Sequence, residues 1–138
     1  MKRDKPSAAH RSRCPLTAAL DLIGDKWTLV ILRDVMEGKH RYGEIQASPE
    51  NIPTNILSNR LRRLVEEGII EKHAYQERPL RHAYTLTQKG ADLLPVLQQA
   101  ARWGQKYVSN CDTPPDWFFR AKPKDVLGRQ QTDRRRRS

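Results

Sequence analysis

The sequence predicts a mainly α-helical domain that carries one small β-hairpin. Apolar residues recur every three or four positions through most of residues 14–108, which is the spacing of helices with one buried face. Within this stretch, residues 69–87 instead hold two runs rich in Ile, Tyr and Thr, as short strands do. A length of 138 residues suits one domain. We therefore expect a domain at 14–108, a basic, disordered arm at 1–13 and an extended, basic tail at 109–138.

The first two helices are predicted at residues 15–23 and 26–37. Gly24 is suited to end the first, and Asp25 is a good N-cap for the second. Apolar residues cover most of the circumference of the second helix, so it is expected at the centre of the core.

A short helix at residues 42–47 and a longer one at 54–67 follow, with turn-forming residues at 48–51 between them. Pro53 precedes the longer helix and Gly68 follows it, as is common at helix starts and ends. Its leucines and one valine form a buried stripe at positions 57, 61, 64 and 65. The outward face and its flanks hold Asn55, Ser58, Asn59, Arg60, Arg62, Arg63 and Glu66.

Two strands are predicted at residues 69–75 and 82–87. The loop between them carries Arg78 and Arg81 around Pro79, which stiffens it. This basic tip either contacts a polyanion or keeps two edge strands soluble.

The last predicted helix runs from an N-cap at Thr87 to about residue 108 and bends at Pro95. Its apolar stripe is long enough to extend beyond a small core. The segment after it has three prolines and an aromatic cluster at 117–119, and is expected to be extended and to pin those rings to the domain.

Charge is concentrated at the two ends of the chain. The net charge is +10, but residues 1–13 and 129–138 each carry five basic residues and one aspartate, which leaves +2 for the rest. The tails either add sequence-independent attraction to phosphates or only improve solubility. Specific binding of nucleic acid has to be argued from the folded part.

The order helix, turn, amide- and Arg-bearing helix, hairpin is that of a winged helix-turn-helix. In this motif the second helix enters the major groove of DNA, where Asn pairs with adenine, Arg with guanine, and Ser or Thr with either. The candidate base-reading residues are Thr54, Asn55, Ser58 and Asn59. The candidate phosphate-binding residues are Lys39, Arg41, Arg60, Arg62, Arg63, Arg78 and Arg81. For each residue alone, the alternative is an ordinary solvated surface.

Five segments in this order resemble the HxlR family of bacterial winged-helix regulators over nearly all of residues 14–108. They are CPLTAALDLIGDKWTLVILRDVMEG, RYGEIQ, IPTNILSNRLRRLVEEGII, RHAYTLTQKG and ARWGQKYV. The resemblance implies a transcription regulator that binds a palindromic promoter site as a homodimer. Two-fold symmetry then predicts half-sites about 34–36 Å apart on the double-stranded DNA.

The resemblance also implies that the first and last helices of the domain pack across the two-fold axis. The candidate interface residues are Leu16, Leu20, Leu97, Ala101, Trp103, Gly104, Tyr107 and Val108. The alternative is that the stripe of the last helix packs entirely within one subunit.

Cys14 is a candidate redox-sensing residue. It precedes the first helix, where the positive end of the helix dipole stabilises a thiolate, and Arg11 and Arg13 are near in sequence. The resemblance implies that some family members sense oxidants or electrophiles at the matching position. An electrophile or another small molecule is therefore a candidate effector, while the alternative is an inert, buried cysteine.

The sequence does not favour an enzyme. It shows no paired carboxylates in apolar surroundings, no nucleophile with a partner base and no Gly-rich phosphate loop, and its four histidines are scattered. We expect no cofactor and no metal. The competing function is a winged-helix protein-interaction module that does not bind DNA, and acidic or apolar residues on the fourth helix would favour it.

The sequence also favours a cytoplasmic protein without membrane contact. No window approaches the roughly 18 uncharged apolar residues of a membrane span, and the apolar stretch at 14–24 lacks the features of a leader. Two cysteines are too few for a disulfide framework, which fits a reducing compartment.

Overall fold

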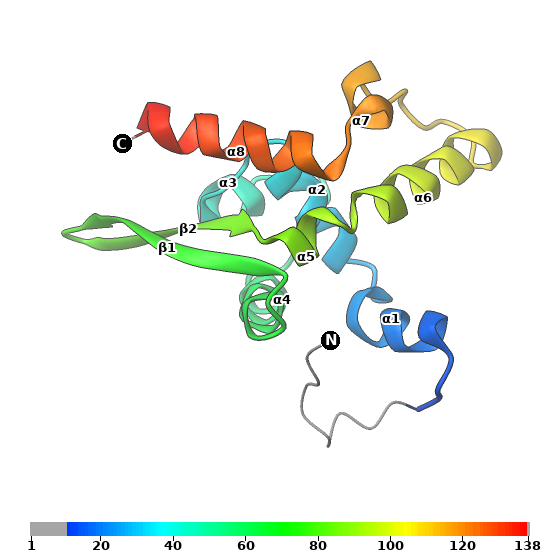
Figure 1. Cartoon of the computed structure of the whole chain (residues 1–138), viewed down its shortest axis with the longest axis horizontal. Helices are drawn as coiled ribbons and strands as arrows, with labels where there is room; N and C mark the ends of the chain where they lie inside the picture. Colours follow the sequence, from blue (N-terminus) through cyan, green and yellow to red (C-terminus); the bar gives the residue numbers. More distant parts are fainter. Residues whose placement is uncertain (1–10, 138) are drawn as a thin grey trace.

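The structure is a computed structural model that describes residues 11–137, with side chains described as far as residue 133. Its elements are α1 (Pro15–Ile23), α2 (Thr28–Met36), α3 (Tyr42–Gln46), α4 (Thr54–Glu66), β1 (Ile70–Glu77), β2 (Leu80–Leu86), α5 (Gln88–Ala91), α6 (Leu94–Tyr107), α7 (Asp116–Arg120) and α8 (Pro123–Arg137). The hairpin projects from one side of the body, and α1 and α6 project from the other (Figure 1). The predicted mainly helical fold with one hairpin is confirmed. Most of the predicted disordered arm at 1–13 lies outside the described residues.

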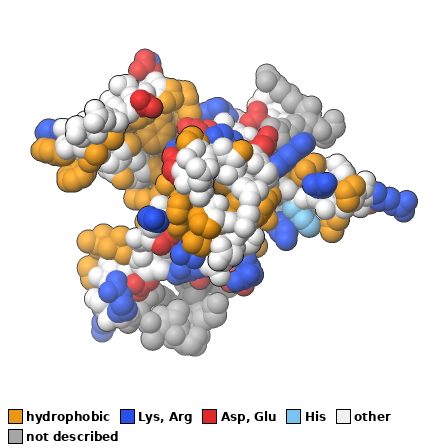
Figure 2. All heavy atoms as spheres, turned by 180° about the vertical axis from the view of Figure 1, so that it is seen from behind, with side chains coloured by type: hydrophobic (Ala, Val, Ile, Leu, Met, Phe, Trp, Pro, Cys, Tyr) orange, Lys and Arg blue, Asp and Glu red, His pale blue; other side chains and the backbone are white. Residues whose placement is uncertain are grey.

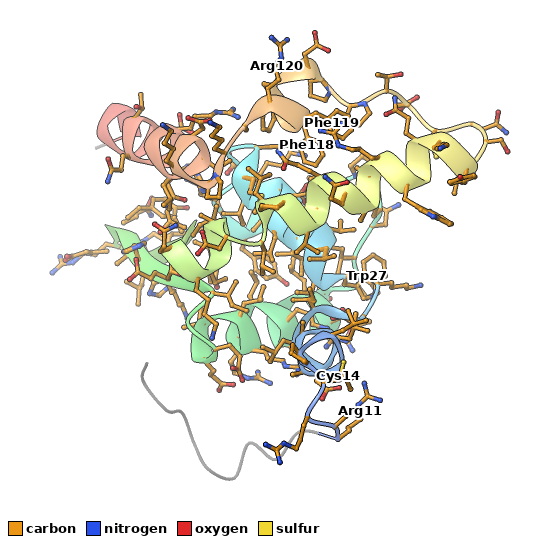
Figure 3. The ribbon with its side chains drawn as sticks, turned by 45° about the vertical axis from the view of Figure 1, so that its right-hand side comes forward. Arg11, Cys14, Trp27, Phe118, Phe119 and Arg120 are labelled. Atoms are coloured by element: carbon orange, nitrogen blue, oxygen red, sulfur yellow. The ribbon has the colours of Figure 1, made fainter. Side chains whose placement is uncertain are left out.

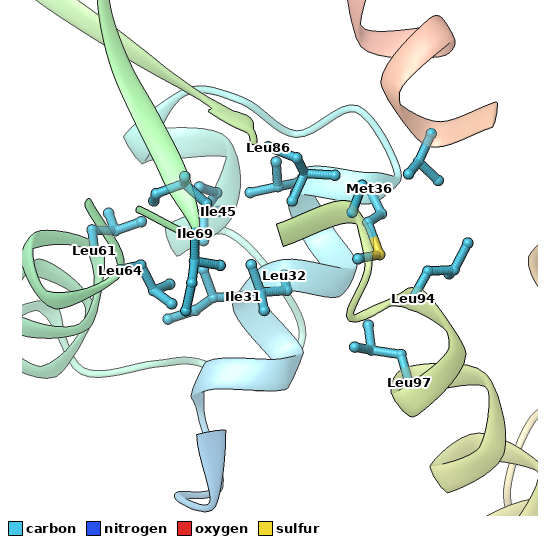
Figure 4. Packing of buried hydrophobic residues seen from close by; sticks show 14 of the residues in the cluster. Ile31, Leu32, Met36, Ile45, Leu61, Leu64, Ile69, Leu86, Leu94 and Leu97 are labelled. Carbon is cyan, nitrogen blue, oxygen red and sulfur yellow. The ribbon is translucent and has the colours of Figure 1, made fainter. Parts of the chain in front are cut away.

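The helix α2 forms the centre of the core, as its apolar circumference predicts. Ile31, Leu32 and Val35 are at most 1% exposed. They meet leucines of α4 on one side and of α6 on the other (Figure 4). Asp25 acts as the predicted cap: its Oδ2 accepts from the backbone N–H groups of Trp27 and Thr28 at 3.0 and 3.1 Å. The helix itself begins at Thr28, after this capped turn.

A buried carboxylate fixes the turn between α3 and α4. Asp34 on α2 is fully buried and accepts a hydrogen bond from the hydroxyl of Ser48 in that turn. The neighbouring Arg33 binds Asp34 and both carboxylate oxygens of Glu50, the latter at 2.7 and 2.9 Å. Because the turn is held to α2, the angle between α3 and α4 is set by the core.

The hairpin is longer and its loop shorter than predicted. β1 and β2 pair antiparallel from Ile70↔Leu86 to Glu77↔Leu80, with an irregularity between Ala74 and Gln76. The expected six-residue loop reduces to Arg78 and Pro79, because exposed residues with no strand-like pattern still pair once the first rungs bring them opposite each other.

The prediction of a single last helix at 87–108 is wrong, because the helix is interrupted between Ala91 and Leu94, just before Pro95. α5 is capped by Thr87, whose Oγ1 accepts from Gly90 N at 3.2 Å, and α6 starts anew at Leu94. Pro95 lacks an N–H group and is tolerated in a first helical turn but not in a helix interior. Gly90 is required where it lies, because a Cβ there would be 2.1 Å from the carbonyl oxygen of Ile69.

The expected extended tail at 109–138 is instead largely helical. α8 lies along the side of β2 and packs on α5, where Val126 is 1% exposed (Figure 1). The side-chain amide of Gln130 accepts from Leu86 N and donates to Leu86 O, both at 2.9 Å. The sequence did not predict this because Val126, Leu127 and the amide of Gln130, rather than a long apolar stripe, hold α8 on the body. The aromatic cluster is pinned to the body as expected, through the buried Phe118.

Candidate nucleic-acid interface

The four predicted base-reading residues share one exposed face of α4. Thr54, Asn55, Ser58 and Asn59 are all exposed, on the side opposite the buried Leu57, Leu61 and Leu64. The amphipathic spacing of α4 produces this arrangement, because residues three and four positions apart lie on one side of a helix. Amides and hydroxyls so displayed can pair with base edges.

Tyr42 couples α3 to this face. Its hydroxyl donates to the carbonyl oxygen of Thr54 at 3.3 Å and forms a hydrogen bond with Ser58 Oγ at 3.2 Å. Ser58 is therefore held in place by α3. This tyrosine was not among the predicted site residues, because its contact with α4 depends on the turn between the two helices.

The guanidinium groups of two predicted phosphate-binding arginines are engaged within the chain. Arg60 Nε donates to Asp25 Oδ2 at 3.0 Å, and a guanidinium N–H of Arg63 donates to the carbonyl oxygen of Asp21. Both arginines are half-buried, whereas Arg62 is exposed. Arg60 and Arg63 thus tie α4 to α1 and to the turn before α2, rather than extending freely as the sequence predicts.

The turn before α2 carries a strongly stabilised carboxylate. Partial burial alone would raise the pKa of Asp25, but hydrogen bonds from Thr28, Arg60 and Trp27, with the charge of Arg60, lower it to about 2. The carboxylate of Asp25 is therefore ionised at neutral pH.

The predicted cations of the wing lie at its tip and beside its strands. Arg78 and Arg81 are exposed at the tip. Arg41 pairs with Ala83 in the middle of β2, with its guanidinium carbon 4.1 Å from the ring centre of Tyr75, and Lys39 Nζ is 3.9 Å from Asp34 Oδ1. Lys39 and Arg41 are thus partly engaged within the chain, while the two tip arginines make no ion pair among the described residues.

A groove of about 420 Å³ separates α4 from the wing. It is lined by Tyr42, Ser58, Leu61, Arg62, Val65, Glu66, Lys72 and Tyr84. Lys72 was not among the predicted site residues. Strand alternation was the signal that could have revealed it, because Lys72 shares a face with the buried Ile70, and that face turns toward α4.

The predicted dimer face separates into an exposed and a buried part. Leu16 and Leu20 on α1 and Trp103, Tyr107 and Val108 at the end of α6 are exposed. Figure 2 shows hydrophobic side chains gathered on both projecting helices. The rings of Trp103 and Tyr107 have their centres 5.4 Å apart and form one apolar surface.

The start of α6 belongs to the subunit core instead. Leu97 is 6% exposed and packs with Leu94 and Met36 (Figure 4), so its expected interface role is corrected. The cause is the break at Pro95, which turns the first turn of α6 against α2. Ala101 packs partly on the same core, and Gly104 is half-buried.

Cys14 is exposed at the N-terminal end of α1 (Figure 3). Backbone N–H groups of Thr17 and Leu16 lower the pKa of its thiol from the ordinary value of 9.0. The alternative of a buried cysteine is therefore wrong. Arg11 does not act on the thiol as expected, because it is paired with Asp21 at 2.7 Å.

No helix within the described residues is long and apolar enough to cross a membrane. The same part of the chain holds no group of three or more His, Cys, Asp or Glu residues that could bind a metal ion.

A helix with an exposed amide face, docked on a shorter helix and followed by a basic hairpin, defines a winged helix-turn-helix protein. The chain belongs to the family of HxlR-like helix-turn-helix proteins, whose model matches residues 22–112.

Known relatives support this assignment. The HTH-type transcriptional regulator Mb3122 of Mycobacterium bovis is 41% identical over 97 residues, which are 70% of this chain and 61% of that protein. This chain thus matches only about three-fifths of that relative's length. The redox regulator HypR in its oxidized form is 33% identical with a TM-score of 0.63, over 72% of this chain and 100% of that one. The reduced form of the transcriptional regulator YodB from Bacillus subtilis is 31% identical with a TM-score of 0.59, over 73% of this chain and 100% of that one.

Proposed function

We propose that the protein is a transcription regulator that binds a palindromic promoter site as a homodimer. The observation that carries this proposal is the exposed row of Thr54, Asn55, Ser58 and Asn59 on α4. Two amides and two hydroxyls on one rod of this length match the donor and acceptor pattern of the major groove.

The phosphate contacts come from the wing and from the groove beside α4. Arg78 and Arg81 at the tip reach the DNA backbone or the minor groove of the DNA. Arg62 and Lys72 line the protein groove between α4 and the wing, and face the DNA strand that lies there. Lys39 and Arg41 contribute beside the strands of the wing. Arg60 and Arg63 are left out, because their guanidinium groups are engaged by α1 and the turn before α2.

The homodimer forms through the exposed apolar surface of α1 and the end of α6. Exposed leucines, Trp103 and Tyr107 are typical of an interface, which supports this assignment. A two-fold dimer carries two copies of α4, one for each half of a palindrome.

The test is a binding titration of the protein on the DNA upstream of its own gene over a series of salt concentrations. Affinity should fall steeply and linearly on logarithmic axes, with Arg78→Ala making the slope shallower by about one and weakening all sequences alike. Asn55→Ala should cost about 1–3 kcal/mol at one base position per half-site. Salt-independent binding, or equal losses on every sequence for both variants, would reject the proposal.

We further infer that an electrophile or oxidant acting on Cys14 modulates this binding. Its support is the exposed, easily ionised thiol at the start of α1, and the hydrogen bond from Arg63 that connects α1 to α4. The sulfur adds to an electrophile such as a quinone ring, and the added bulk shifts α1 against its copy in the dimer.

Quinone treatment should lower the affinity of the wild-type protein and of Cys111→Ser, and should leave Cys14→Ser unchanged. Cys111→Ser is the matched control, because Cys111 is also exposed but lies outside the helices. An unchanged affinity when mass spectrometry shows Cys14 fully modified would remove this regulatory role and leave DNA binding untouched.

A further inference from the structure

A line of hydrogen bonds runs from the start of α2 to the exposed face of α4. Asp25 Oδ2 accepts from Arg60 Nε at 3.0 Å, and Arg60 Nη1 donates to Asn59 Oδ1 at 2.8 Å. Arg60 is therefore the link between a capping carboxylate and one of the two amides on that face.

The position of Arg60 is set by the core of the protein. The carboxylate of Asp25 is held by the first turn of α2, through Trp27 N and Thr28 N and through Thr28 Oγ1 at 2.5 Å. The side chain of Arg60 is 25% exposed and that of Asp25 is 24% exposed, so the guanidinium lies in a half-buried slot between α2 and α4.

The chemistry of this contact determines which way the Asn59 amide faces. A guanidinium has only donors, so the amide atom turned toward Arg60 has to be the oxygen. The nitrogen Nδ2 then points away from Arg60, with its two hydrogens available on the exposed side. An amide with no such neighbour can flip and offer either a donor or an acceptor.

We propose that Arg60 is a specificity-determining positioning residue that orients Asn59 so that Nδ2 reads a hydrogen-bond acceptor in the major groove. Guanine, adenine and thymine each present an acceptor there, whereas cytosine presents only its N4 amino donors. The Asn59 contact therefore rejects cytosine on the contacted strand. Adenine remains a suitable partner, because its N7 accepts from Nδ2 while Oδ1 stays bound to Arg60. This inference rests on the proposed DNA binding by α4.

The role differs from that of a phosphate contact. A phosphate-binding arginine raises affinity for all sequences and gives no preference, whereas a positioning arginine changes the preference at one base position. It also differs from a role in stability alone, because partly exposed ion pairs contribute little to stability and their loss leaves the fold intact.

The first test needs no DNA. Nuclear magnetic resonance of the uniformly 15N-labelled full chain reports the mobility of the Asn59 side-chain amide, assigned by its loss in Asn59→Ala. Wild-type protein should give a rigid amide, and Arg60→Met should make it as mobile as exposed Asn55. Equal mobility of the Asn59 amide in both proteins would overturn the proposal whether or not the protein binds DNA.

The second test measures base preference. Duplexes selected from a randomised pool by the wild-type protein are varied at every position, and binding is measured for wild type, Arg60→Met, Asp25→Asn and Asn59→Ala. Wild type should bind the cytosine-substituted site at one position about 10-fold or more worse than the best site. Arg60→Met and Asp25→Asn should each reduce that ratio to about the value measured for Asn59→Ala. The double variant, Arg60→Met with Asn59→Ala, should show the same ratio as Asn59→Ala alone.

Arg62→Met is the matched control, because it removes a cation from the exposed side of α4 without touching Asn59. It should weaken all sites by one factor and keep the ratio. Asp25→Asn leaves residue 60 an arginine but removes the charge of its partner at residue 25. It therefore tests the same orientation of Asn59 if the Arg60→Met protein does not fold. An unchanged ratio in a folded Arg60→Met or Asp25→Asn overturns this inference, whereas wild-type protein with no base preference anywhere overturns the proposed function instead.

Discussion

Neighbouring residues on α4 have different tasks, although all are polar. Asn59 is exposed, Arg60 is bound to Asp25, and Arg62 borders the groove beside the wing. Their spacing of about 100° per residue turns each side chain toward a different neighbour. Charge alone therefore does not identify a phosphate contact, and the partner of each guanidinium decides its task.

Asp25 should make the free energy of unfolding depend on pH in the acidic range. Its pKa is about 2 in the folded protein against 3.8 ordinarily, so the ionised carboxylate favours the folded state above about pH 4, and this advantage is lost as the pH falls toward 2. We expect Asp25→Asn to lower the free energy of unfolding at pH 5 by up to about 1 kcal/mol, a value that allows for solvent screening of a partly exposed pair.

Urea unfolding of wild type and Asp25→Asn at pH 5 and at pH 2.5 measures this difference. The gap between the two proteins should narrow at the lower pH. A gap that stays constant or widens on acidification would show that the charge of Asp25 does not contribute.

At the scale of elements, α8 replaces hydrogen bonds that a further strand would otherwise supply. The amide of Gln130 pairs with both backbone groups of Leu86 at the end of β2, and Val126 fills the space beside α5. A side-chain amide reproduces the donor and acceptor of a peptide group, which is why one glutamine can dock a helix on a strand.

Gln130→Ala should destabilise the protein by about 2 kcal/mol, because it leaves a buried N–H and a buried C=O of Leu86 without partners. Thermal and urea unfolding measure the loss. Gln131→Ala is the control, since its neighbouring side chain is exposed and should change stability by less than about 0.5 kcal/mol. Equal effects of the two variants would contradict a docking role for Gln130.

At the scale of the whole molecule, the two projecting helices lie opposite the wing (Figure 1). Leu16, Trp103 and Tyr107 on these helices are exposed, so their apolar side chains are not buried within the subunit. The exposed row on α4, formed by Thr54, Asn55, Ser58 and Asn59, is not part of that surface.

Trp103→Glu should convert the proposed dimer into a monomer, because the interface would have to bury an unpaired charge. Sedimentation equilibrium measures the mass, and binding to a full palindrome should fall to the level of a half-site. Gln105→Glu places the same charge at another exposed position of α6, outside the predicted interface residues, and should remain dimeric. A wild-type protein that is monomeric at all concentrations would contradict the proposed assembly.

Much of the fold follows from local patterns. The order of α1 to α4, the hairpin and the exposed amides on α4 depend on residues within one or two helical turns of each other, so apolar spacing and capping residues were enough to predict them. The lengths of the strands and the break at Pro95 were less accessible, because pairing and packing extend or end elements beyond what local preference indicates.

By itself, the sequence determined the buried leucines of α4 and the exposed row of Thr54, Asn55, Ser58 and Asn59 opposite them. Only the tertiary structure decided that Arg60 and Arg63 bind Asp25 and Asp21, that Leu97 belongs to the core and that residues 116–137 fold back as helices. The physical reason is distance along the chain. Asp25 and Arg60 are 35 residues apart, and Leu86 and Gln130 are 44 apart, so nothing in the local pattern of either partner specifies the contact until the core brings them together.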